Sequence, residues 1–239
     1  MTPSLVAHSA ELETTSDLQR QIPAEEVNIL KHLEQEFLTL ELKNMTSFSK
    51  GTVVLIPDWS QHAASPRAIN YLRHALIDYG WNTIAMMVPT PLPSLSNDAL
   101  VAYQTDFQGR LTEVLKRAAA QPGNVIIVAQ GSSGALITLM LQRKELTEPQ
   151  GLVLLSAHLQ DVQMNQSVAL SISQHQVPTL DIMHQQDNPF VEHTSQRRLQ
   201  LTRKHMKELY RQRILAGTID DDPSWLFKEI YGWLTFVGY

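Results

Sequence analysis

Short apolar runs that alternate with segments of helical pattern constrain this fold more than any other feature. "GTVVLIP" (51–57) is a continuous apolar run, typical of a strand that is buried on both faces of its sheet. Comparable runs follow, separated by helical patterns, at residues 81–89, 125–129, 151–157, 179–184 and 211–216. The alternation predicts a mostly parallel sheet with helices on both faces, which is an α/β fold.

An antiparallel hairpin is expected ahead of the parallel strands. "EVNILKHL" and "EFLTLELKN" each alternate apolar and polar residues around a turn at 34–35, although a helix through 24–40 is the alternative. Residues 1–22 are polar and show no periodicity, which predicts a flexible N-terminal arm. The rest, 23–239, is expected to form a single domain with a two-sided core.

Composition excludes several classes of function. A formal charge of −5 leaves no basic surplus for a general nucleic-acid binder. The absence of cysteine excludes disulfides and thiolate metal sites, and no apolar run reaches the roughly 18 residues that span a bilayer. The first 21 residues lack the basic end and apolar stretch of a signal peptide, so we expect either a cytoplasmic protein or a mature chain without its leader.

The segment "VIIVAQGSSGAL" (125–136) passes from strand to helix through small residues, as does the elbow that presents a catalytic serine. The strained elbow requires small residues two positions before and after its tip. Ser133 at the tip satisfies this requirement. A second register places Gly131 at the tip, keeps the usual strand length and leaves no nucleophile. Ser132 at the tip fits least, because bulky Gln130 then stands two positions before it.

The order of elements resembles the α/β-hydrolase superfamily over about residues 25–239. More narrowly, "FLTLELKN", "GTVVLIPDW", "LRHALIDYGWNTIAMMVP" and "VAQGSSGA" resemble a bacterial α/β-hydrolase-like family of unknown function. This resemblance implies a fold and a pocket edge but no established activity. Members of that family often begin with an export leader, which favours a periplasmic location over a cytoplasmic one. It also implies that a small cap over the pocket could lie at 157–177.

The resemblance supplies an acid but no base. In "VPTLDIMHQQDNPF", Asp187 stands at the place of the hydrolase acid, although an Asp before Asn-Pro is also good turn chemistry. The histidine is expected between the last strand and the last helix, where the chain reads "TIDDDP" and has none. Without a base, a serine hydroxyl is a poor nucleophile. His62 and His184 are the candidates for a displaced base.

Other residues are expected at the carboxyl edge of the sheet, where ligands of such folds bind. Asp58 and Trp59 follow the first parallel strand, and His158 and Asp161 follow the strand at 151–157. His158, Asp161 and His184 match no metal-ligand spacing, so we expect no metal and no cofactor. "GSSG" at a helix start could hold an anion on its amides, but it is neither a P-loop nor a dinucleotide fingerprint.

These features favour a hydrolase-fold protein with a degenerate triad that binds a small molecule or a protein partner without catalysis. The alternative is an active serine esterase with Ser133 as nucleophile, Asp187 as acid and a displaced histidine as base. A third hypothesis is an assembly protein that docks a partner through Trp225, Tyr231 and Trp233. At their helical spacing, however, these aromatic residues also suit the core face of the last helix.

Overall fold

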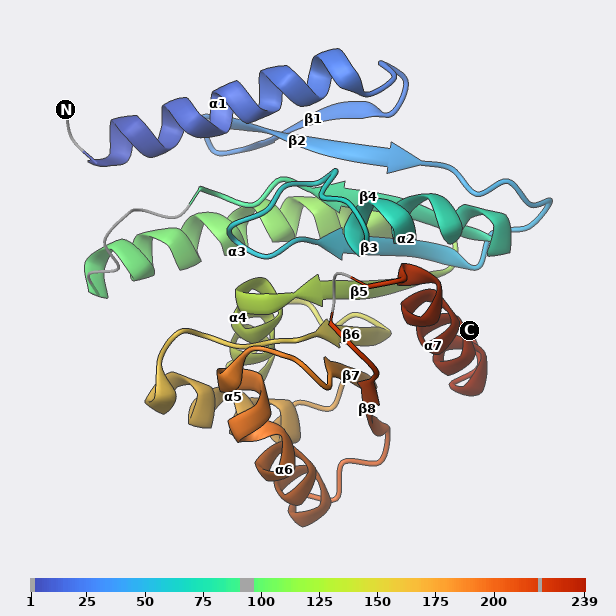
Figure 1. Cartoon of the computed structure of the whole chain (residues 1–239). Helices are drawn as coiled ribbons and strands as arrows, with labels where there is room; N and C mark the ends of the chain where they lie inside the picture. Colours follow the sequence, from blue (N-terminus) through green and yellow to red (C-terminus); the bar gives the residue numbers. More distant parts are fainter. Residues whose placement is uncertain (1–2, 91–96, 219–220) are drawn as a thin grey trace.

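A single eight-stranded sheet organises the molecule (Figure 1). The computed structural model describes residues 3–90, 97–218 and 221–239. Across the sheet the strands follow the order β1-β2-β4-β3-β5-β6-β7-β8. Their bounds are β1 Val27–His32, β2 Gln35–Leu42, β3 Gly51–Ile56, β4 Trp81–Met86, β5 Asn124–Gln130, β6 Gly151–Leu155, β7 Thr179–His184 and β8 Tyr210–Leu215.

The sheet is parallel from β4 to β8 and antiparallel at its N-terminal edge. β1 and β2 form the expected hairpin, with Val27 opposite Leu40 and His32 opposite Gln35, so a helix through 24–40 is excluded. β2 also pairs antiparallel with β4, while β3 pairs parallel with both β4 and β5. The predicted fold class is therefore confirmed.

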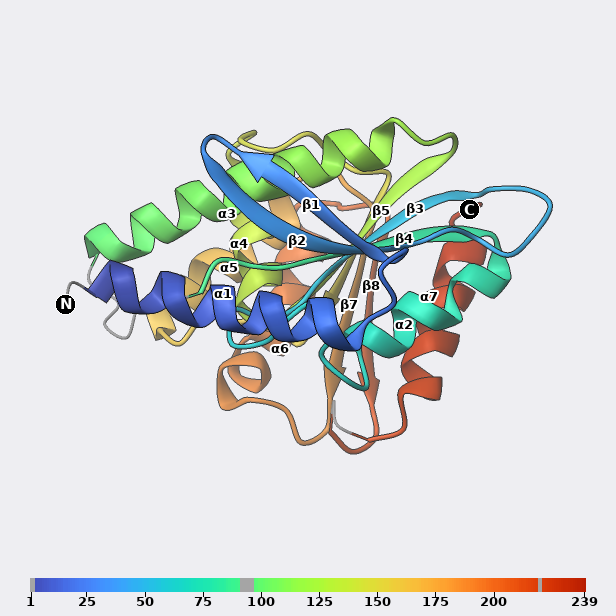
Figure 2. The ribbon, with the colours of Figure 1, turned by 90° about the horizontal axis from the view of Figure 1, so that it is seen from above.

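Helices cover both faces of the sheet (Figure 2). They are α1 Pro3–Gln21, α2 Ile69–Ala75, the 3-10 helix η1 Ile77–Tyr79, α3 Asn97–Ala119, α4 Gly131–Gln142, α5 Val162–Gln174, α6 Pro189–Lys204 and α7 Pro223–Phe236. Buried residues of α3, α4 and α5 share one core with the sheet, and those of α2 and α7 share another on the opposite face. α6 packs beside α5. None of the helices described is long and apolar enough to cross a membrane.

The continuous apolar run of β3 is explained by these two cores. Val54 and Ile56 belong to the core under α3 and α4, whereas Val53 and Leu55 belong to the core under α2 and α7. Because successive strand residues point to opposite faces, every position of this central strand is buried. The candidate site lies beyond the carboxyl ends of these buried strands.

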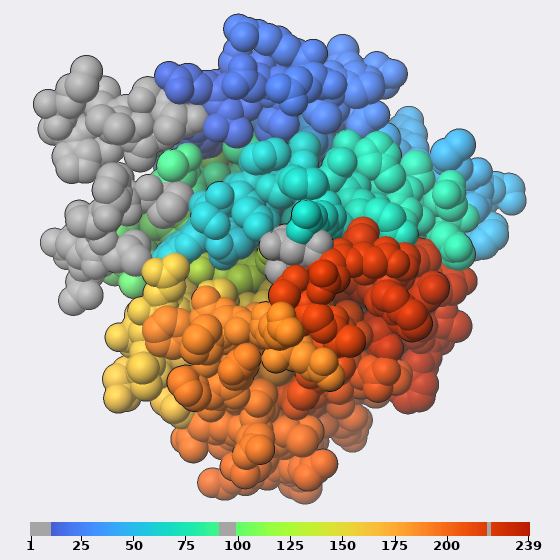
Figure 3. All heavy atoms as spheres, viewed as in Figure 1, coloured from blue at the N-terminus to red at the C-terminus, as the bar shows by residue number. Residues whose placement is uncertain are grey.

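The N-terminal segment departs from the expectation of a flexible arm. Residues 3–21 form α1, which lies beside the hairpin of β1 and β2 (Figure 1). The blue atoms at one end of the molecule in Figure 3 belong to this N-terminal part of the chain. Leu18 is buried in the core shared with α2, and the carboxylate of Glu11 pairs with the buried guanidinium of Arg110. Hydrophobic periodicity could not predict this helix, because an ion pair with a residue 99 positions away fixes part of it.

Two further segments differ from the sequence interpretation. The stretch 157–177, expected as a possible cap, contains α5, whose Val168 and Ile172 are buried against the sheet. α5 therefore serves as a covering helix between α4 and α6. In α7, Trp233 is a core residue, whereas Trp225 is 63% exposed and carries the Lys228 ammonium over its ring.

Candidate active site

The turn between β5 and α4 has Gly131 at its tip. Gly131 adopts a left-handed conformation with φ +53°, while Gln130 before it is extended. Left-handed backbone is strained for residues with a Cβ, and glycine adopts it freely. Of the three possible registers, the backbone therefore has the one with Gly131 at the tip. Ser132 and Ser133 both lie on the first turn of α4.

The carboxylate of Asp58 lies against this tip. Its Oδ1 accepts a hydrogen bond of 2.7 Å from the Ser132 amide, and its Oδ2 accepts one of 2.8 Å from Ser60 Oγ. A Cβ added to Gly131 would collide with Asp58 Oδ1. In a serine-hydrolase elbow, the amide that follows the nucleophile is a donor of the oxyanion hole. Here that amide is occupied by a carboxylate from the loop after β3.

Ser133 is buried and its hydroxyl is engaged. Its Oγ donates a 2.6 Å hydrogen bond to the carbonyl oxygen of Pro57, and the residue has no exposed surface. A peptide carbonyl can accept this hydrogen bond but cannot remove the proton. The arrangement therefore anchors α4 to the end of β3 and does not activate Ser133 as a nucleophile.

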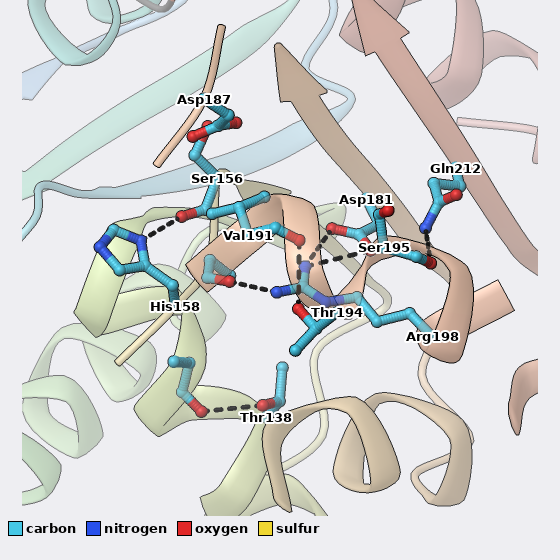
Figure 4. Close-up of polar contacts among 12 residues, drawn as sticks. Thr138, Ser156, His158, Asp181, Asp187, Val191, Thr194, Ser195, Arg198 and Gln212 are labelled. Carbon is cyan, nitrogen blue, oxygen red and sulfur yellow. Dashed lines mark hydrogen bonds and ion pairs between the residues drawn. The ribbon is translucent and has the colours of Figure 1, made fainter. Parts of the chain in front are cut away.

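Asp187, the predicted acid, lies in the turn after β7 next to Ser156 (Figure 4). Its Oδ2 accepts from Ser156 Oγ at 2.6 Å and from the His184 amide at 2.9 Å, while its Oδ1 accepts from the Asn188 amide at 2.7 Å. Ser156, directly after β6, has φ +50°, a strained conformation for a serine. The carboxylate is thus fixed by a serine and two amides.

The predicted histidine candidates do not approach the serines of the elbow. His158 contacts the Ser156 carbonyl through Nδ1 at 2.8 Å, and its amide donates to the Gly131 carbonyl at 3.3 Å. His62 accepts from the Ala64 amide through Nδ1 at 3.2 Å, and burial lowers its pKa. The hydrogen bonds of both rings are thus to backbone groups, and only the backbone of His158 contacts the elbow, at Gly131.

His184 is the histidine nearest the acid, at 4.0 Å between its Nδ1 and Asp187 Oδ2. That Nδ1 is buried and has no hydrogen-bond partner. Burial lowers the pKa of His184, against the opposing charges of Asp187 and Asp221. A lowered pKa favours a neutral imidazole, but no hydrogen bond between described residues connects it to Ser132 or Ser133.

The described residues contain no group of three potential metal-ligating side chains. Asp161, considered in sequence with His158 and His184, instead caps α5 by accepting a 2.7 Å hydrogen bond from the Met164 amide. Trp59 follows Asp58 in the loop after β3. Its ring packs edge-on against Tyr103, with 6.0 Å between the ring centroids. The candidate site thus has one carboxylate at the elbow and one at the acid position, while Trp59 and Tyr103 belong to the core under α3 and α4.

Sequence reasoning missed two contacts of this site. The Asp58–Ser132 contact joins residues 74 positions apart, and the Ser156–Asp187 contact joins residues 31 apart. The resemblance placed Asp58 at the pocket mouth, but only the backbone shows that its carboxylate meets the elbow amide. Ser156 lies near the carboxyl end of the strand predicted at 151–157, and ligands of such folds bind at that edge of the sheet. This position was the sequence signal that could have indicated Ser156.

Comparison with known structures agrees with this architecture. Thermogutta terrifontis esterase 2, phosphorylated by paraoxon, superposes with a TM-score of 0.68 at 10% identity, covering 91% of this chain and 96% of the esterase. Est1E from Butyrivibrio proteoclasticus, with ferulic acid bound, gives 0.68 at 8% identity over 87% of this chain and 98% of its own. Dienelactone hydrolase from Anabaena variabilis gives 0.62 at 12% identity, over 88% and 98%.

The chain therefore has the α/β-hydrolase fold. It belongs to the family described as protein of unknown function DUF3530, whose model matches residues 4–109 and 102–235. No curated protein matches the sequence.

Proposed function

We propose that this α/β-hydrolase-fold protein binds a ligand or partner without hydrolysing it. The observation that carries the proposal is the 2.7 Å hydrogen bond from the Ser132 amide to Asp58 Oδ1, beside a tip residue that is glycine. Gly131 supplies no nucleophile, and Asp58 fills the space that a nucleophile side chain would need. The two features are complementary, which supports a fold adapted to a non-catalytic role.

Electrostatics supports the same conclusion. Ester hydrolysis places negative charge on the carbonyl oxygen, and removal of a single oxyanion-hole donor typically lowers kcat by about 10²- to 10³-fold. In this protein the equivalent amide already donates to a carboxylate. An oxyanion at that position would lose the donor and would also meet the negative charge of Asp58.

The competing function is ester hydrolysis with Ser133 as nucleophile and Asp187 as acid. Its support is the presence of esterases and dienelactone hydrolases among the proteins of similar structure. Ser133 would first have to leave the Pro57 carbonyl, and a histidine would have to move to it. The fold alone is compatible with ester hydrolysis. A binding role also accounts for the hydrogen bond between the Asp58 carboxylate and the Ser132 amide.

Covalent labelling separates the two functions. The full chain would be incubated with a broad fluorophosphonate, alongside the Ser132→Ala and Ser133→Ala variants, and its intact mass measured. We expect no adduct in a protein that circular dichroism shows to be folded. An adduct that disappears only in Ser133→Ala would overturn the proposal and establish Ser133 as a nucleophile.

A further inference from the structure

The loop between β2 and β3, residues 43–50, projects from the molecule at the amino ends of the parallel strands. In both ribbon views it reaches furthest to the right (Figure 1 and Figure 2). Its sequence, "KNMTSFSK", places Met45 and Phe48 between Lys43 and Lys50 and contains no acidic residue. The side chains of Met45 and Phe48 are 74% and 60% exposed. The loop therefore presents two apolar side chains at its surface.

These two side chains continue into an aromatic cluster. Phe48 Cε2 and Lys50 Cγ both lie 3.3 Å from the point where a Cβ on Gly80 would stand. Tyr79, beside this glycine, is 41% exposed, and its ring packs against Tyr231 with 4.7 Å between centroids. Isolated exposed apolar side chains are ordinary on protein surfaces, whereas a contiguous group of them marks an interaction site.

Hydrogen bonds fix the loop in this conformation. The Met45 amide donates to the Ile77 carbonyl at 2.9 Å. The side-chain oxygen of Asn82 accepts from the amide and the side-chain nitrogen of Asn44, each at 3.0 Å. These bonds leave the side chains of Met45 and Phe48 free of any holding role. Binding through them would thus require little ordering of the chain.

Lysine side chains flank the apolar residues on both sides. Lys43 is exposed, and no ion pair holds its ammonium within the described part of the chain. Lys50 is half-buried, and its ammonium lies 5.3 Å from the centre of the Tyr231 ring. Asp78 of η1 lines a separate depression on α2, together with Arg67. Both lysines can therefore meet negative charge on a partner.

Acidic residues near the first of these lysines do not cancel the positive charge. In the depression that this lysine lines, the carboxylates of Glu26 and Glu41 bind Arg73 and Arg117. Glu25, exposed in the same depression, forms no ion pair among the residues that the structure describes. Counted with both lysines, four cations and three carboxylates give a local formal charge of +1, in a chain whose total is −5.

We propose that the loop patch, formed by Met45, Phe48 and Tyr79 with the flanking Lys43 and Lys50, docks the protein on the surface of an anionic lipid bilayer. Apolar side chains enter the boundary between headgroups and acyl chains, and aromatic rings with a polar group lie at the headgroup level. Lysine side chains extend along apolar surface and place their ammonium groups among anionic headgroups. The elbow lies at the opposite, carboxyl ends of the strands, so docking is independent of what the elbow binds.

The shape of the loop favours a bilayer over a folded protein as the partner. A projecting tip with two apolar side chains needs either a partner with a matching hollow or a medium that it can enter. A fluid bilayer accepts such a tip without complementary shape, and its apolar boundary region removes the side chains from water. The flanking lysines then select a bilayer with negative surface charge.

Sedimentation of the full chain with lipid vesicles tests the proposal. Vesicles of phosphatidylcholine alone would be compared with vesicles in which about a third of the lipid is phosphatidylglycerol. We expect the mixed vesicles to bind the protein about tenfold more tightly, because both lysines then meet anionic headgroups. Added salt should reduce this difference, since it screens the charges. No binding to the mixed vesicles, or equal binding to both preparations, would overturn the proposal.

Substitutions separate the apolar from the charged contribution. Met45→Ser and Phe48→Ser are each expected to weaken binding to mixed vesicles about tenfold, because an inserted apolar side chain is lost. Lys43→Gln is expected to weaken it about fivefold. Two controls should leave it unchanged: Val162→Ser, at a 60% exposed position after the carboxyl end of β6, and Lys204→Gln, on α6. Circular dichroism would show that each variant is folded.

Two further outcomes would refute insertion into a bilayer. Binding that Lys43→Gln weakens and neither apolar substitution weakens would show adsorption by charge alone. Binding to soluble polyglutamate without binding to vesicles would show that an acidic polypeptide covers the loop. Neither result would alter the labelling experiment at the elbow, so the docking surface and the proposed function fail separately.

Discussion

Asp58 Oδ1 lies 2.7 Å from the amide nitrogen of Ser132, at the amide that a serine hydrolase reserves for an oxyanion. The same oxygen occupies the space beside Gly131 that a side chain would require. The loop after β3 and the turn after β5 are therefore matched to one another. The first two predictions follow from this match.

Removal of the Asp58 carboxylate is expected to destabilise the protein. Asp58→Ala leaves the Ser132 amide without its charged acceptor at the start of α4, which typically costs about 1–3 kcal/mol. Asp58→Asn keeps an acceptor oxygen and should cost less. Urea unfolding measures both variants. Equal stability of wild type and Asp58→Ala would show that the contact contributes nothing to folding.

Introducing a serine at the tip of the elbow is expected to destabilise the protein while Asp58 is present. Gly131→Ser introduces a Cβ at a left-handed position and against Asp58, and we expect a loss of about 2–4 kcal/mol. Asp58→Gly in the same chain removes the collision but leaves the backbone strain. A double-mutant cycle should therefore give a favourable coupling of about 1–2 kcal/mol. Strict additivity would contradict the steric argument.

We predict that the hydrogen bond between Ser156 and Asp187, at the position of the hydrolase acid, stabilises the fold. Ser156→Ala removes the 2.6 Å hydrogen bond to Asp187 Oδ2, and a hydrogen bond to a charged group contributes about 1.5–3 kcal/mol. The urea midpoint should therefore fall. Ser167→Ala, at an exposed position on α5, is the matched control and should leave the midpoint nearly unchanged. A similar small effect for both variants would argue that Asp187 does not depend on Ser156.

Periodicity predicted the sheet and most helices because burial imposes it on the sequence. β3 is apolar at its buried central positions Val53, Val54 and Leu55, and β1 alternates because it forms the edge of the sheet. The tip at Gly131 was one of three registers open in the sequence, since spacing alone cannot show which residue has positive φ. The contacts of Asp58 and Asp187 depend on tertiary geometry between separate strands. Local patterns therefore indicated where the site lies but not what its groups bind.

Acid is predicted to destabilise the protein through His175. Burial, with the Lys207 charge beside it, lowers the pKa of His175 from 6.5 to about 3. Between these values the unfolded chain binds the proton more strongly, so stability rises with pH across the window and is lost as pH falls toward about 3. His175→Gln should flatten the dependence of urea stability on pH, whereas exposed His193→Gln should not. An unchanged slope in His175→Gln would contradict the assignment.

The last prediction concerns α1, which the sequence indicated as a flexible arm. Glu11→Ala leaves the buried Arg110 guanidinium with Asp106 alone, and breaking a buried ion pair typically costs about 3–5 kcal/mol. Because Asp106 remains, we expect a loss near the lower end of that range, together with faster amide exchange across residues 11–21. Glu13→Ala, an exposed position of the same helix, should change neither quantity. If the two variants behave alike, the ion pair does not hold α1, and Leu18 is left as the contact that fixes the helix on the sheet.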